Sequence, residues 1–426
     1  MQRSETLNIC MTHYAFYPTT GGVETHLLDL CAELVRQGNQ VHALVGSMPG
    51  QPAESEIEGI HVHRVDWMNP EILRERKEAA HVATDEVWPP LQAEVKENYL
   101  RFIRDHHIDA VHAHNFHHFL PEYGMALTEI RREYGIPTFL TIHEMWGEFL
   151  CHDLLERTEW DRIIAVGQHV YGDMVAQVKD PGNVEVVLHG VNVEMFHPNL
   201  QGERLKAELG LTGKRVILHP ARLLPWKGVH TTVEAFRMVA DRFPDVSLVV
   251  TDTREILDWI HELEGYRERI FAMVEENNLR DRVVMRPFDF FKELPEAYGM
   301  ADIVVYPTSG EEPFGLVPLE AMASGKPIIV TRSGGLTESV VDGVTGFVIP
   351  KEDSALLANR LTALLERPEL AQRMGQAGRQ HVEAQFTRRR MALEVEALYR
   401  AARGRAPVAQ QPGWARSLHK VTSTHD

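Results

Sequence analysis

The chain has 426 residues, of which 44% are hydrophobic and 25% charged, and its formal net charge is −17. This length favours two domains, and this composition is typical of a soluble globular protein. The negative charge argues against a nucleic-acid partner, and no apolar run approaches the roughly 20 residues that span a bilayer.

The cysteines and the N-terminus suggest a cellular compartment. Cys10, Cys31 and Cys151 are scattered without a C-x-x-C pair, so neither a disulfide framework nor a zinc ribbon is indicated. The first residues, MQRSETLNICMTHYAFYP, hold no long apolar segment of a secretory signal. We therefore expect a cytoplasmic protein without stable membrane insertion.

The first elements form a β-α-β pattern. Leu7–Met11 reads as a strand, Val23–Gln37 as a helix with apolar residues at helical spacing, and Val41–Val45 as the next strand. Such a unit opens a parallel, doubly wound domain. Gly21 and Gly22 stand where the chain enters the helix, and glycines there let the backbone approach a ligand closely, although a simple tight turn is an alternative.

A histidine-rich segment, DAVHAHNFHH, follows further along the chain. Ala110–Ala113 is predicted to be a strand, which points His112 and His114 to one face. With His117 and His118 nearby, four imidazoles could suggest a metal site. However, no carboxylate or cysteine joins them at ligand spacing, so we predict no metal here.

The strand Pro137–His143 ends on a second histidine signal. The sequence H-E-M-W-G, which includes Trp146, lacks the second histidine of H-E-x-x-H, so a metalloprotease is excluded. His143 is left at the end of a strand, where it serves either a site or the core.

Two cations, Arg222 and Lys227, share one strand-to-helix loop. The loop joins the predicted strand Arg215–Pro220 to the predicted helix Val229–Phe243. A departing pyrophosphate needs such cations because negative charge builds on it as the bond breaks. Two solvated surface cations are the alternative.

The stretch TSGEEPFGLVPLEAMASGKP carries two acids and a helix start. The strand Ile303–Tyr306 leads into a loop with Glu312, and Pro318 is placed as the first residue of a helix over Leu319–Ala323. Glu312 and Glu320 can then face one crevice. Because a helix N-terminus attracts anions and the C-terminal edge of a parallel sheet binds ligands, we expect an anionic ligand here.

The spacing E-P-F-G-L-V-P-L-E resembles the E-x7-E motif of retaining family-4 glycosyltransferases. Other segments match the same family: G-G-V-E-T-H, A-R-L-L-P-W-K-G and G-G-L-T-E-S-V-V-D-G-V-T-G. H-G-V-N-V-E-M-F-H-P also matches, with His189 where asparagine is usual and Asn192 where aspartate is usual. Ala221 replaces the usual glycine before Arg222.

The resemblance implies an α/β GT-B fold, in which two Rossmann-like, doubly wound parallel-sheet domains face a cleft and a C-terminal helix crosses back. It implies an acceptor-binding domain over residues 1–198 and a nucleotide-sugar-binding domain over residues 199–385. A crossover helix is implied over residues 386–403, packing on the N-terminal domain, and a flexible tail over residues 404–426.

The resemblance further implies front-face transfer of a sugar from a UDP- or GDP-sugar to a small polar acceptor, with retention and without a metal or cofactor. The implied catalytic residues are His143, Glu312, Arg222 and Lys227. Donor contacts are implied for Glu312, Arg222 and Lys227. They are also implied for Gly21, Gly22, Pro287, Phe288, Phe314, Gly315, Leu316 and Glu320. The acceptor-side residues are His114, His117, His118 and Trp146.

Several alternatives stay open or are weighed. A glycosidase needs carboxylates that straddle the bond, which Glu312 and Glu320 on one segment do not suit. A nucleotide-sugar epimerase of similar fold, and transfer to a lipid or polysaccharide, remain alternatives. A non-catalytic sugar-nucleotide sensor would tolerate the loss of His143 or Glu312, and both are present. The choice of base and a possible homodimer are undecided.

Overall fold

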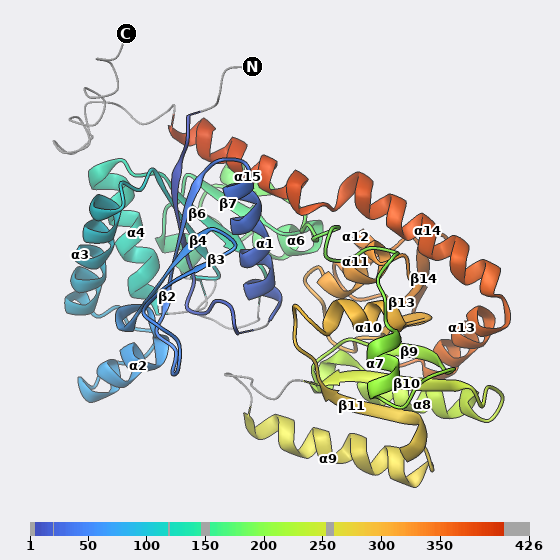
Figure 1. Cartoon of the computed structure of the whole chain (residues 1–426). Coiled ribbons are helices and arrows are strands. Elements are labelled where there is room, and N and C mark those ends of the chain that lie inside the picture. The colour runs from blue at the N-terminus through green and yellow to red at the C-terminus, as the bar shows by residue number, and fades with distance from the viewer. Residues whose placement is uncertain (1–4, 20, 118–119, 146–153, 253–259, 404–426) are drawn as a thin grey trace. The chain divides into compact units, whose positions relative to one another are not determined.

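The chain folds into two compact α/β units. The computed structural model describes residues 5–19, 21–117, 120–145, 154–252 and 260–403. Unit 1 comprises Met1–Leu188 with Met391–Asp426, and unit 2 comprises His189–Arg390 (Figure 1). The tail expected over 404–426 lies outside the described residues.

The boundary between the units lies at Leu188–His189, whereas the sequence placed it at 198/199. The intervening segment is hydrogen-bonded inside unit 2. The Val191 N–H donates to Phe386 O at 2.8 Å, and a guanidinium nitrogen of Arg379 donates to Phe196 O at 2.8 Å. A short helix, α7 (Glu203–Glu208), lies just after the predicted boundary.

Unit 1 is built on an eight-stranded sheet in the order β3-β4-β2-β1-β5-β6-β7-β8. All neighbours are parallel except β3, which is antiparallel to β4. The strands are β1 (Asn8–Thr12), β2 (Gln40–Gly46), β3 (Glu54–Ile57), β4 (Ile60–Val65), β5 (Ala110–His114), β6 (Thr138–Ile142), β7 (Arg162–Ala165) and β8 (Val184–Val186).

The strands of unit 1 pack against helices at both ends of the sequence. The core of α1 and β1 includes Met391, Val395 and Tyr399, so the last helix completes unit 1. The helices are α1 (Gly22–Arg36), α2 (Pro70–Ala79), α3 (Pro89–Asp105), α4 (Pro121–Tyr134), α6 (Gln168–Met174) and α15 (Arg388–Arg403), with short η1 (Asp66–Met68) and η2 (Pro181–Asn183).

Unit 2 has a six-stranded parallel sheet in the order β11-β10-β9-β12-β13-β14. Counted from β9, this is the 3-2-1-4-5-6 order of a dinucleotide-binding fold, whose order reverses between β9 and β12. The strands are β9 (Arg215–His219), β10 (Val246–Asp252), β11 (Val283–Pro287), β12 (Ile303–Tyr306), β13 (Ile328–Thr331) and β14 (Gly346–Ile349).

The connections between the strands of unit 2 contain helices that pack on its sheet, and the apolar faces of these helices help form its core. Besides α7, they are α8 (Val229–Ala240), α9 (Ile260–Glu276), α10 (Leu294–Met300), α11 (Leu316–Ala323), α12 (Leu336–Ser339), α13 (Ser354–Glu366) and α14 (Pro368–Gln385), with short η3 (Pro225–Lys227) and η4 (Arg280–Arg282).

Two sequence expectations need correction. The hairpin of β3 and β4 was not assigned, because its strands are short and carry charged residues and histidines. Pro318 is not the first helical residue, since α11 begins at Leu316. Proline is tolerated there because the N–H groups of the first helical turn have no intrahelical acceptor anyway.

Within the described ranges, no helix combines the length and apolar character needed to cross a membrane.

Candidate active site

The loops that follow β9 and β12 converge at the point where the strand order of unit 2 reverses. Val304 of β12 pairs with Leu218 of β9, so the carboxyl ends of the two strands lie side by side. Gly228, with φ +75°, ends η3, and a Cβ there would lie 1.8 Å from the Pro307 carbonyl oxygen. Only glycine permits this approach, which sets the loop after β9 against the loop after β12.

A three-residue cluster occupies this switch point. Lys227 Nζ donates to Glu312 Oε2 at 2.7 Å and to the Tyr306 hydroxyl at 2.8 Å, and that hydroxyl also donates to Glu312 Oε2 at 3.1 Å. Burial opposes the charge of Lys227, but the neighbouring Glu312 carboxylate holds the lysine pKa above its ordinary value. Burial also raises the pKa of Tyr306, which stays a neutral donor. Lys227 is therefore a cation fixed in place before any ligand arrives.

Arg222 lies on the same loop and differs from Lys227. Its side chain is half-buried, and no hydrogen bond or ion pair of its guanidinium is found within the described part of the chain. Its carbonyl accepts from Leu224 N–H at 2.7 Å, which fixes the backbone of the loop. A half-buried guanidinium with open donors suits an anionic ligand.

The glycine loop after β13 supports the start of α11. Gly335 N–H donates to Glu312 O at 2.8 Å, and Ser333 Oγ accepts from Glu312 N–H at 3.0 Å. A Cβ on Gly335 would lie 2.2 Å from Pro313 O, so this close contact requires glycine. Together, these bonds position Phe314, Gly315 and Leu316, whose N–H groups lie at a helix start that favours anions.

The second acid, Glu320, is buried inside α11 and has a defined partner. The Tyr298 hydroxyl donates to Glu320 Oε2 at 2.6 Å. Burial, together with this carboxylate, raises the pKa of Tyr298. The Tyr298 hydroxyl, which belongs to α10, thus fixes one oxygen of Glu320 and orients the carboxylate.

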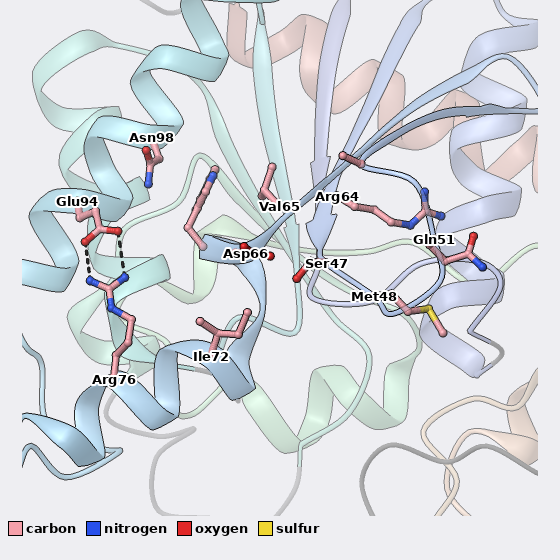
Figure 2. A pocket seen from close by; sticks show the side chains of 12 residues that line it. Ser47, Met48, Gln51, Arg64, Val65, Asp66, Ile72, Arg76, Glu94 and Asn98 are labelled. Carbon is pink, nitrogen blue, oxygen red and sulfur yellow. Dashed lines mark hydrogen bonds and ion pairs between the residues drawn. The ribbon is translucent and has the colours of Figure 1, made fainter.

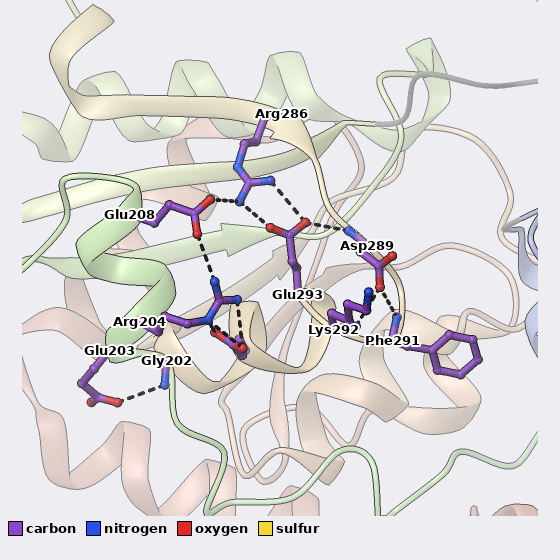
Figure 3. Close-up of polar contacts among 10 residues, drawn as sticks. Gly202, Glu203, Arg204, Glu208, Arg286, Asp289, Phe291, Lys292 and Glu293 are labelled. Atoms are coloured by element: carbon purple, nitrogen blue, oxygen red, sulfur yellow. Dashed lines mark hydrogen bonds and ion pairs between the residues drawn. The ribbon is translucent and has the colours of Figure 1, made fainter.

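The loop after β11, predicted to contact the donor, is held by a network of hydrogen bonds and ion pairs (Figure 3). Arg286 forms two bonds to Glu293, at 2.8 and 3.3 Å, and its guanidinium lies 4.4 Å from the centre of the Phe288 ring. Glu293 accepts the Asp289 N–H at 2.8 Å, and Arg286 also occupies the Pro287 carbonyl at 2.9 Å. The Pro287 oxygen therefore already has one partner, while the Phe288 ring is half-buried.

In unit 1, three histidines gather where β5 and β6 end. His114 Nδ1 and His143 Nε2 are 3.0 Å apart, and the ring of His26, from the first turns of α1, lies 4.6 Å from that of His143. All three are buried, and burial lowers the pKa of His26 to about 3. Burial and the neighbouring imidazoles lower the pKa of His114 as well. The rings of His26 and His114 are therefore neutral near pH 7.

The Gly21–Gly22 turn precedes α1 as predicted, with Gly21 as the N-cap and Gly22 as the first helical residue. A Cβ on Gly22 would meet no atom within 4 Å, so the backbone there is open on one side. His13, after β1, donates from Nδ1 to the His114 carbonyl at 3.0 Å, and its Nε2 lies 3.8 Å from Glu24 Oε1. The ends of β1 and β5 are thus joined beside this turn.

The other histidines that the sequence singled out do not belong to this three-histidine cluster. His112 does share a face with His114, but its two nitrogens bond to Tyr399 at 2.6 Å and Thr141 at 2.7 Å, so it is a structural residue. His117 bonds to the Glu144 carbonyl at 2.9 Å. His118 and Trp146 lie outside the described residues.

A pocket of about 550 Å³ lies at the carboxyl ends of β2 and β4 in unit 1 (Figure 2). Its polar lining includes Asp66, Asn98 and Arg64, and Arg76 and Glu94 close one wall through two bonds of 2.7 and 3.0 Å. This is the ligand-binding edge of a parallel sheet. The pocket was missed from sequence because β4 was not assigned.

Three further residues escaped the sequence analysis: Tyr306, Tyr298 and His26. Tyr306 is the last residue of β12 and precedes Glu312 by 6 positions, and its position at a strand end was the available signal. His26 follows Gly22 by one helical turn, so it faces the same side as the glycine turn. Nothing in the local sequence marks Tyr298.

Two family descriptions match successive parts of the chain. "Glycosyl transferases group 1" matches residues 201–381, and "Glycosyltransferase Family 4" matches residues 20–195. The first match contains the switch-point cluster of unit 2, and the second contains the glycine turn and the histidines of unit 1.

Relatives and solved structures agree with this assignment. A D-inositol 3-phosphate glycosyltransferase of Arthrobacter sp. (strain FB24) is 28% identical over 405 residues, covering 89% of this chain and 90% of its own. Sucrose-phosphate synthase from Thermosynechococcus elongatus has a TM-score of 0.75 at 23% identity, covering 93% and 98% of the two chains. Anabaena Alr3699/HepE in complex with UDP and glucose has a TM-score of 0.69 at 20% identity, covering 92% and 98%. This chain belongs to the group 1, family-4 glycosyltransferases and has the GT-B type of fold.

Proposed function

We propose that this enzyme transfers a sugar from a UDP- or GDP-sugar to a small polar acceptor, with retention at the anomeric carbon and without a metal ion. The observation that carries the donor assignment is the switch point of unit 2. There, a fixed lysine, an arginine with open donors and a helix start offer positive charge at the ligand-binding edge. The solved Anabaena relative binds UDP and glucose, which supports a nucleotide-sugar donor.

We assign the donor diphosphate to Arg222, Lys227 and the N–H groups of Phe314, Gly315 and Leu316. Two cations and a helix start can neutralise a diphosphate, so no metal is required for its departure. Glu320, anchored by Tyr298 through one oxygen, would accept ribose hydroxyls. Glu312 would accept hydroxyls of the transferred sugar, next to Lys227.

In the proposed front-face reaction, the bond between the anomeric carbon and the diphosphate oxygen breaks through an oxocarbenium-like state. The acceptor oxygen then bonds to the same face, and its proton passes to the departing diphosphate. Lys227 and Arg222 would stabilise the charge that develops there. In unit 1, we assign His143 and the Gly21–Gly22 turn to substrate contacts, and His114 and His117 to the acceptor side.

The acceptor proposal rests on the pocket at the ends of β2 and β4. Its lining of a carboxylate, an amide, a hydroxyl and guanidinium groups suits a polyol such as a cyclitol or a sugar better than a lipid chain. Arg64 is buried and bonds to Ser55 Oγ at 2.8 Å and to the Tyr17 carbonyl at 2.8 Å. The relative named as an inositol-phosphate glycosyltransferase supports a small hydroxylated acceptor.

The test is a matrix of UDP- and GDP-sugars against cyclitols, cyclitol phosphates and sugars, with and without EDTA. Nucleoside diphosphate released only when both donor and acceptor are present, with unchanged rates in EDTA, is the expected result. The anomeric configuration of the product is then read by proton NMR. Inversion, or a rate that depends on added Mg²⁺ or Mn²⁺, contradicts the mechanism, and conversion of the donor sugar without release indicates an epimerase.

A further inference from the structure

A second group of histidines lies in unit 1, at a distance along the strands from the pocket edge. His42 is on β2, His63 is on β4, and His106 directly follows α3. One nitrogen from each ring lies within 4.8 Å of the other two. His42 and His63 are buried, and His106 is half-buried. Such a convergence of three imidazoles is the donor set that first-row transition metals prefer.

A carboxylate completes the arrangement. Glu54 of β3 lies 2.7 Å from His63 Nδ1, while His63 Nε2 faces His42 Nδ1 at 3.0 Å. When Glu54 accepts the Nδ1 proton, Nε2 of His63 is left with a lone pair directed at the cluster. A carboxylate that orients a histidine in this way is the usual support of a metal ligand. Because the Glu54 side chain is exposed, this group of residues lies next to solvent.

The distance between the nitrogens of His42 and His63 is close to that between two ligands of one metal ion. Two nitrogens bound to tetrahedral zinc at 2.0–2.1 Å lie about 3.3 Å apart. The observed 3.0 Å between His42 and His63 therefore needs only a small opening.

We propose that His42, His63 and His106 bind a divalent transition-metal ion of the zinc type, with Glu54 orienting His63. Water would take the fourth coordination position. The ion would fasten the β3–β4 hairpin and β2 to the end of α3. The site is structural, because these residues lie on the strands before the pocket edge and outside the proposed donor and acceptor contacts.

Cobalt(II) is the probe, because its visible absorption reports coordination by nitrogen ligands. Tag-free, chelator-treated full-length enzyme is titrated with cobalt(II), and zinc is then added in competition. One equivalent of tetrahedral or five-coordinate cobalt, displaced by zinc, is expected. His42→Gln/His63→Gln should abolish this spectrum, while His169→Gln, on α6 and outside both histidine groups, should leave it unchanged.

Two further variants keep the test decisive. Glu54→Gln leaves all ligands in place and should weaken metal binding by about 10–100-fold while the circular dichroism spectrum stays that of the wild type. His26→Gln/His114→Gln removes the other histidine cluster and should not alter the cobalt spectrum. The proposal is overturned if wild-type enzyme binds no cobalt, if the His42/His63 variant retains the spectrum, or if the spectrum disappears only in the His26/His114 variant.

Discussion

The ammonium group of Lys227 lies 2.7 Å from a carboxylate oxygen of Glu312, although the two residues are 85 positions apart in the sequence. Strand order brings them together, since β9 and β12 are neighbours in the sheet and both loops leave the same edge. The side chains are only 15% and 12% exposed, so neither charge is well solvated. The cation proposed for the leaving group is therefore positioned by the acid proposed for the sugar.

Lys227→Met should lower the transfer rate by about 10²–10³-fold, because it removes a fixed cation from the developing diphosphate charge. It should also lower the free energy of unfolding, since Glu312 then stays poorly solvated without its partner. Lys227→Met/Glu312→Gln should regain stability but not activity. Rates of diphosphate release and urea midpoints separate the two effects, with Lys179→Met as the exposed control. A double variant that regains activity contradicts the assignment.

Arg222→Ala should slow transfer by about 10²-fold while changing the free energy of unfolding by less than about 0.5 kcal/mol. The reason is that its guanidinium has no partner within the described ranges, so its removal leaves no buried group unsatisfied. Arg215→Ala is the matched control, for which the opposite effects on rate and stability are expected. Arg215 binds Asp245 at 2.7 and 3.0 Å, far from the switch-point loops, so its loss should lower stability and leave kcat unchanged. Equal kinetics for the two variants would refute the diphosphate role.

Glu320→Gln should raise the dissociation constant of the nucleoside diphosphate by about 10-fold, because a hydrogen bond to a charged acceptor is worth about 1.5–3 kcal/mol. Tyr298→Phe should have a smaller effect in the same direction, since it removes only the 2.6 Å bond that orients the carboxylate. Calorimetric titration with UDP and GDP measures both and also identifies the base. Glu366→Gln, an exposed ion-pair residue, is the control. Wild-type binding by Glu320→Gln would exclude the ribose contact.

Motif spacing predicted much of unit 2. The strand–loop–helix pattern around Glu312 and the cations near Lys227 stand at strand ends, and parallel sheets bring such ends to one edge. The sequence could not show that Lys227 pairs with Glu312 through Tyr306, because that contact depends on which strands are neighbours. It also could not show the partner of Glu320, because Tyr298 lies on another helix and carries no local signal.

In unit 1, the sequence predicted less. His112 and His114 share a face, as strand alternation requires. Alternation alone could not show that His112 is satisfied by Tyr399, which comes from the far end of the chain. The pocket at the ends of β2 and β4, and the separate group of His42, His63 and His106, both depended on an unassigned hairpin. Short strands whose burial alternates only partly give a weak periodic signal, so that hairpin was not detected.

The free energy of unfolding should fall as the pH drops from about 6.5 towards 3. His219 is fully buried, and burial lowers its pKa to about 3 from an ordinary value of 6.5, so only the unfolded chain binds this proton in that window. Each such histidine contributes a slope of about 1.4 kcal/mol per pH unit, with stability rising as pH rises. His219→Gln should reduce this slope in urea unfolding measured from pH 4 to 7, whereas His169→Gln should not. An unchanged slope in His219→Gln would show that the folded protein already accommodates the proton.

Asp66→Asn should raise the KM for the acceptor by about 10–100-fold and leave the donor KM and the melting temperature close to wild type. Asp66 is exposed at the end of β4 and lines the pocket, so its carboxylate is free of any role in the core. A carboxylate that accepts an acceptor hydroxyl contributes about 1.5–3 kcal/mol, and an amide recovers only part of this. Steady-state kinetics with each substrate varied in turn make the measurement, with the exposed Asp85→Asn as the control. A rise in the donor KM instead would place the donor, rather than the acceptor, in this pocket and would contradict the proposed assignment of the acceptor to unit 1.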